Sequence, residues 1–202
     1  MSFSQTRAAR AARAAVLLAP ALLLAGCISF GSEPPPTLLT LTSTTAPQAN
    51  AGASGSTASA IIVGIPEAPA KLDVTRVPVQ VTDSQVAYVK EAVWVEKPAR
   101  LFRRLIAETM RTRSNAVILD VDDPVASGSS TLTGYLREFG YDARTGEAVA
   151  VFDAIRTAND GAITTRRFES RVPSVTPEAM PVGAALNTAA NQIAVQVADW
   201  AV

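Results

Sequence analysis

The sequence contains no histidine and one cysteine, and these two shortages exclude several kinds of site. Without histidine the chain cannot form a Ser-His-Asp triad, a Cys-His nucleophile pair or a histidine-containing zinc site. With Cys27 as its single thiol it cannot form a disulfide within the chain. We therefore expect a fold stabilised by packing alone, with no metal and no bound cofactor.

Long hydrophobic runs are also scarce. The uncharged run from Ala14 to Gly26 follows Arg7, Arg10 and Arg13, an order typical of a secretory signal peptide. As a helix the run would span about 20 Å, well short of the roughly 30 Å hydrocarbon layer. The run therefore suits export better than a permanent membrane span, and we assign residues 1–26 to a signal peptide.

The charge balance gives no sign of a nucleic-acid partner. Lys plus Arg and Asp plus Glu both number 18, and removal of the three signal-peptide arginines leaves a mature net charge of about −3. The sequence also has no phosphate-binding loop, so it does not predict nucleotide hydrolysis.

Leu24, Ala25, Gly26 and Cys27 stand directly after the apolar run and match the bacterial lipobox. This resemblance implies cleavage between Gly26 and Cys27, a diacylglycerol on the Cys27 sulfur and a fatty acid such as palmitate on the new amino group. Ile28, where an Asp would signal retention, resembles lipoproteins sorted to the outer membrane. The alternatives are a secretory signal with a chance cysteine, or a buried free cysteine.

Residues 27–60 are rich in Ser, Thr, Ala, Gly and Pro, and we expect an acylated N-terminus followed by a flexible tether. One exception lies inside this segment. Residues 38–42 are apolar and β-prone, so they could add a strand or dock on a neighbouring element.

Residues 61–202 predict one α+β domain: a mixed, mainly antiparallel sheet of about five or six strands with two packed helices. We expect a buried strand at 61–65, a hairpin over 76–89, a central strand at 116–119 and a three-strand meander over 131–172. A helix should begin at Pro98 and end near Arg113, and a second should begin at Thr176-Pro177-Glu178, with Thr176 as the N-cap.

Two polar helix faces are candidate surfaces for a partner or for lipid head groups. The first helix carries basic residues opposite its apolar stripe, namely Arg100, Arg103, Arg104 and Arg111. The second carries a polar, nearly uncharged face that includes Asn187 and Asn191. Ordinary solvation is the alternative for both faces.

Several carboxylates could support a metal site or a hydrolase. Asp120, Asp122 and Asp123 follow an expected strand, but their spacing lacks the Gly and distal Glu of an EF-hand loop, which favours a polar turn. These residues, Glu91 or Glu96 could supply acid-base groups, but such chemistry needs two groups held across a pocket, which no spacing here indicates.

The order of motifs resembles a known family. The resemblance rests on the lipobox, the tether, the strand beginning at Ile61, Pro66 and Pro69 before Leu72-Asp73, Arg76, and Trp94-Val95-Glu96-Lys97-Pro98 opening a helix. The arrangement is similar to the auxiliary lipoproteins of ABC-type transporters, in particular to the lipoprotein partners of mammalian-cell-entry proteins in lipid transport.

The resemblance implies a non-enzymatic, lipid-anchored periplasmic domain on the outer membrane. Its partner would be a mammalian-cell-entry protein, whose permease and ATPase are separate chains, and its role would be to dock that transporter to the membrane. An alternative is an assembly or secretion lipoprotein that forms a homo-oligomer on the outer membrane.

Overall fold

The computed structural model describes residues 37–45, 49, 52–120 and 130–202. The chain divides into units 1–34 and 35–202, and the description below concerns the second. Leu24, Ala25, Gly26 and Cys27, together with Asp122 and Asp123, lie outside the described residues. In chain order the elements are η1 (Thr57–Ser59), β1 (Ile61–Val63), β2 (Arg76–Gln80), β3 (Val86–Val93), α2 (Pro98–Arg113), β4 (Ile118–Leu119), β5 (Ser130–Asp142), β6 (Glu147–Thr157), β7 (Ile163–Val172) and α3 (Ala179–Ala201).

The strands of the described residues form one mixed sheet of seven, which confirms the predicted α+β class with slightly more strands than expected. Its largest part is the predicted meander: β5 pairs with β6, and β6 pairs with β7, both antiparallel. On its other edge β5 meets β1 near its start and β2 near its end, both in parallel, and β2 forms the predicted antiparallel hairpin with β3.

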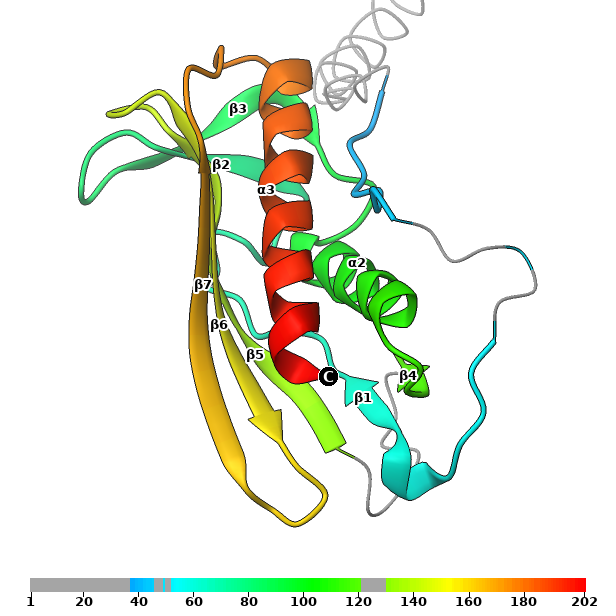
Figure 1. Ribbon diagram of the computed structural model, residues 1–202. Coiled ribbons are helices and arrows are strands. Elements are labelled where there is room, and N and C mark those ends of the chain that lie inside the picture. Colours follow the sequence, from blue (N-terminus) through cyan, green and yellow to red (C-terminus); the bar gives the residue numbers. More distant parts are fainter. Residues whose placement is uncertain (1–36, 46–48, 50–51, 121–129) are drawn as a thin grey trace, which may run out of the picture. The chain divides into compact units, whose positions relative to one another are not determined.

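Both helices lie on one face of this sheet (Figure 1), where they enclose the hydrophobic core. α2 and α3 pack against each other, and α3 also packs against β5, β6 and β7. Phe102 of α2 contacts Phe139 and Phe152 of the sheet, with ring centroids 6.2 and 5.2 Å apart. Burial of these side chains is the main favourable term for the fold.

Two expected details are wrong. The strand at 116–119 is not central: β4 has two residues and pairs with β1 at the sheet's border. The second helix begins at Ala179 with Glu178 as its N-cap, because the Thr176 carbonyl accepts a hydrogen bond from the Glu178 N–H in a turn before the helix.

The segment at residues 37–45, which the composition assigned to the tether, packs against the domain. The Leu39 N–H donates to the Val93 carbonyl at 2.7 Å, and the Leu39 carbonyl accepts from the Val95 N–H at 2.8 Å. A Cβ built on Gly183 of α3 would lie 2.5 Å from Leu39 Cδ2, so glycine makes room for this side chain. The packed unit thus includes residues before Ile61, as the docking alternative for residues 38–42 expected.

Candidate interaction surface on the open face of the sheet

The meander presents one face to α2 and α3, and no helix of the described residues lies on the opposite face (Figure 1). Successive side chains of a strand point to opposite faces. On β6 the alternate residues Ala148, Ala150 and Phe152 belong to the core, so Val149, Val151 and Asp153 point to the other side. We call this second side of β5, β6 and β7 the open face.

The centre of the open face is a cross-strand ion cluster around Asp153 of β6. Arg167 of β7 donates from Nε to Asp153 Oδ1 at 2.6 Å and from Nη2 to Oδ2 at 2.8 Å, a two-pronged arrangement. Arg137 of β5 donates from Nε to Oδ2 at 2.8 Å. Hydrogen bonds from Arg167 first, and then from Arg137, lower the pKa of Asp153 to about 2, against the opposing effect of burial.

The same face continues with a second set of ion pairs. Arg171 of β7 donates from Nε to Glu169 Oε1 at 2.6 Å and from Nη1 to Glu147 Oε2 of β6 at 3.2 Å. These bonds raise the pKa of Arg171, with the Glu169 hydrogen bond as the largest cause. Arg171 and Glu169 of β7 stand opposite Val149 and Val151 of β6, whose exposures are 6% and 8%. The open face is therefore apolar underneath and charged on top.

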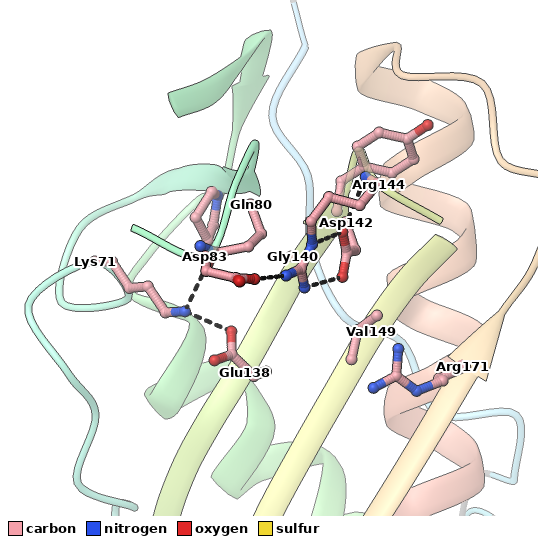
Figure 2. Close-up of a pocket in the computed structure, with 11 residues that line it drawn as sticks. Lys71, Gln80, Asp83, Glu138, Gly140, Asp142, Arg144, Val149 and Arg171 are labelled. Atoms are coloured by element: carbon pink, nitrogen blue, oxygen red, sulfur yellow. Dashed lines mark hydrogen bonds and ion pairs between the residues drawn. The ribbon is translucent and has the colours of Figure 1, made fainter. Parts of the chain in front are cut away.

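A pocket of about 410 Å³ lies at the end of this face where β2, β5 and β6 meet (Figure 2). It is lined by Lys71, Pro78, Gln80, Asp83, Glu138, Gly140, Tyr141, Asp142, Arg144, Val149 and Arg171. Gly140 is needed here because a Cβ on it would lie 2.4 Å from the Pro78 backbone oxygen. Glycine thus lets β2 approach β5 at this point.

Cations and carboxylates pair with one another across this pocket. Arg144 donates from Nη2 to Asp142 Oδ2 at 2.7 Å and from Nε to Oδ1 at 2.9 Å, and it also pairs with Asp83. Lys71 donates to Glu138 Oε2 at 2.5 Å. Figure 2 shows these side chains converging from β5, from the turn after β5 and from the loops around β2. The Arg144 hydrogen bond is the largest cause of a lowered pKa at Asp142.

Asp142 and Asp153 are poorly suited to act as general acids. A general acid needs a raised pKa, whereas Asp142 and Asp153 are both held in the ionised form by arginine. The other considered carboxylates are also in ion pairs: Glu91 with Lys90, Glu96 with Arg104, and Asp120 with Arg111. Among the described residues, no three metal-ligating side chains converge.

The four predicted arginines of α2 do not form one free basic face. Arg103 is buried with 8% exposure, so its place in an exposed face is a correction to the sequence prediction. Arg104 pairs with Glu96. Arg111 donates from Nε and Nη2 to the Ile118 carbonyl at 3.2 and 3.1 Å and also pairs with Asp120, so it ties α2 to β4. Arg100 is exposed.

The two predicted asparagines of α3 hold the chain's own N-terminal segment. The Asn187 side-chain oxygen accepts from the Thr42 N–H at 2.9 Å, and the Asn191 side-chain oxygen accepts from the Thr44 N–H at 2.8 Å. Asn191 has 6% exposure, so it is not an open contact surface as predicted. Residues 42–44 of the same chain cover this part of the face, and a partner on the remaining part stays a prediction.

The open face itself was missed by the sequence reasoning, although a signal for it was present. Arg167, Glu169 and Arg171 alternate along β7 with a period of two, which places three charges on one face of a strand. The partners of these residues on β5 and β6 follow from strand register, which the sequence does not give directly. Lys71 and Glu138 meet across 67 residues, and no local pattern indicates that contact.

No helix within the described parts of the chain is both long enough and apolar enough to cross a membrane.

Comparisons with known proteins give a family for this fold. A search of curated proteins finds no match. A crystal structure of an uncharacterized protein superposes with a TM-score of 0.63 at 13% identity, over 81% of this chain and 99% of that one. A crystal structure of a protein from Xanthomonas campestris superposes with a TM-score of 0.65 at 18% identity, over 81% of this chain and 94% of that one. The PelC dodecamer from Paraburkholderia phytofirmans superposes with a TM-score of 0.43 at 13% identity, over 76% of this chain and 92% of that one.

The first two likenesses confirm the fold. The family model described as "ABC-type transport auxiliary lipoprotein component" matches residues 39–198, which are most of the chain and nearly all of the packed unit. The match begins at Leu39, the residue that pairs with Val93 and Val95. The chain therefore belongs to the family of ABC-type transport auxiliary lipoprotein components.

Proposed function

We propose that this chain is a lipid-anchored, non-enzymatic auxiliary component that docks an ABC-type lipid transporter at the periplasmic face of the outer membrane. Its direct partner in this proposal is a mammalian-cell-entry protein. The proposal joins family membership to the lipobox at Leu24–Cys27 and to the resemblance found in the sequence. Diacylglycerol on Cys27 would confine the domain to a thin layer and raise its effective concentration against the partner.

The open face is the observation that carries the docking role. It has an apolar floor at Val149 and Val151 and a fixed set of charges around Asp153, Glu169 and Arg171. Ion pairs made before binding cost little further side-chain ordering, which favours a protein contact. Acidic and basic groups alternate across the strands, a pattern that suits a partner with matching polar groups better than a uniformly charged ligand.

The proposal is tested by purifying the tagged full chain from detergent-solubilised membranes and identifying the bound proteins by mass spectrometry. We expect a mammalian-cell-entry protein to copurify, together with its permease or ATPase. Thr165→Arg adds bulk to the exposed end of the open face without removing an ion pair, and it should reduce copurification. The matched control is Gln196→Arg on the exposed side of α3, which should leave copurification unchanged. Absence of every ABC transport component from the purified material would refute the proposal.

A second candidate, a homo-oligomeric assembly lipoprotein, is favoured by strand β7. β7 pairs with β6 in unbroken register from Ile163 to Val172, and among the described strands it has no neighbour on its other edge. A long regular edge without a bulge or proline can pair with another strand. Native mass spectrometry of the purified chain shows whether it forms a stable ring without any transporter, and a current measurement across a lipid bilayer shows whether that ring conducts ions. Both results together favour the second function.

A further inference from the structure

Three exposed apolar side chains belong to segments that meet where the N-terminal segment joins the domain. Leu38 is 52% exposed, Val95 is 54% exposed and Met180 is 65% exposed. They come from the N-terminal segment, the loop after β3 and the first turn of α3. We call these three residues the exit patch.

Leu39 holds the members of the exit patch together. It is next to Leu38 in the chain, and its carbonyl accepts the Val95 N–H at 2.8 Å. Its side chain fills the notch at Gly183, and Met180 stands one helical turn before Gly183 on the same side of α3. The three exposed side chains therefore belong to segments that are joined through one anchored residue.

The docked segment limits how far the lipid-bearing Cys27 can lie from the domain. Residues 39, 42 and 44 are hydrogen-bonded to the domain, so the chain is fixed to it from about Leu38 onward. Eleven residue steps separate Cys27 from Leu38, and even a fully extended chain would cover at most about 40 Å. A tether running free to residue 60 would reach about three times as far. A membrane-anchored Cys27 thus keeps the exit patch within about 40 Å of the lipid surface.

We infer that the exit patch rests on the bilayer surface that holds the Cys27 acyl chains. This inference depends on the lipid attachment in the proposed function and adds an orientation to it. The occupant is the boundary between head groups and acyl chains, where partly exposed Leu, Val and Met side chains lose their contact with water. α3 then points its N-terminal end at the membrane, and the β6–β7 turn lies at the far end (Figure 1).

The test uses Cys27 as the single thiol of the chain. The mature chain from Cys27 is coupled to a maleimide-bearing phosphatidylethanolamine in phosphatidylcholine vesicles, with or without bromine on the acyl chains. Bromine quenches tryptophan fluorescence only at short range. Met180→Trp should lose fluorescence in the brominated vesicles, after subtraction of the signal from Trp94 and Trp200 in the parent chain. Leu38→Trp is a second probe of the patch and should behave in the same way.

The matched control is Ile163→Trp, because Ile163 is 66% exposed at the start of β7, beside the far turn. Its fluorescence should be the same in brominated and plain vesicles. Equal quenching at positions 180 and 163, or no quenching at positions 180 and 38, would overturn the inference and assign the patch to a protein contact. Because the anchor is supplied chemically here, failure of this test is separate from failure of lipid attachment in the cell.

Discussion

The side-chain amide of Asn191 donates a hydrogen bond from Nδ2 to the backbone carbonyl of Thr42 at 2.9 Å, although the two residues are 149 positions apart. The same side chain accepts the Thr44 N–H at 2.8 Å. One amide group therefore supplies both a donor and an acceptor to the N-terminal segment, as a neighbouring strand would. This contact turns part of an apparent tether into part of the domain.

Replacing Asn191 by Leu should release the N-terminal segment. The two hydrogen bonds to the backbone of residues 42 and 44 are lost, so the free energy of unfolding should fall by about 1–3 kcal/mol in urea titration. Hydrogen exchange at the Thr44 amide should accelerate. Gln196→Leu, on the exposed side of the same helix, is the control and should change neither quantity. Unchanged protection at Thr44 would show that Asn191 does not hold the segment.

Replacing Gly140 by Ala should destabilise the junction between β2 and β5. The new Cβ would lie 2.4 Å from the Pro78 backbone oxygen, so the backbone must move. We expect a loss of about 1–3 kcal/mol in the free energy of unfolding, a typical cost of overpacking. Gly52→Ala is the control because a Cβ there meets nothing within 4 Å. Equal stability of the two variants would contradict the close approach of these strands.

Asp153 should make stability fall at low pH. Its pKa is about 2 in the folded chain and 3.8 as a free group, so the folded state favours the ionised form. The contribution is fully present above pH 3.8, is lost as the pH falls towards 2, and amounts to about 2 kcal/mol. Asp153→Asn should be less stable at neutral pH and should lack this part of the acid dependence. A variant that retains the parent slope between pH 4 and 2 would show that another group is responsible.

Replacing Cys27 by Ser should abolish lipid attachment. Serine cannot form the thioether, so the variant should remain uncleaved at the signal-peptide stage or appear free of the membrane fraction. Labelled palmitate added to growing cells checks this outcome, with the parent chain as the positive control. Incorporation of label into Cys27→Ser would contradict the assignment of the anchor.

The sequence predicted the elements whose signals are local. The stripe of Leu101, Phe102, Leu105 and Ile106 after Pro98 located α2 at its observed ends, because period and capping are properties of neighbouring residues. The turns around Gly146 and Gly161 likewise located the meander. The predicted start of α3 at Thr176 was wrong because turns and helix N-caps favour the same residue types.

The candidate surface was less accessible to sequence reasoning because it depends on contacts between distant residues. Arg103 has the charge of a surface residue, yet the packing of α2 buries it. The cover over Asn191 comes from residues 42–44, whose Ser and Thr composition resembles that of a tether. The register of β5 and β7 against β6 decides which of their charged residues meet Asp153. This register depends on pairing between strands that are distant in the sequence.

The most direct test of the docking role is photocrosslinking in intact cells. A photoreactive amino acid is placed at Thr165 on the open face or at Gln196 on α3, both of which are exposed. The account predicts that Thr165 forms a crosslink to a mammalian-cell-entry protein of an ABC transport system and that Gln196 does not. A chain that crosslinks to no transport component from Thr165, or that reaches the transporter equally well from Gln196, would contradict docking through the open face.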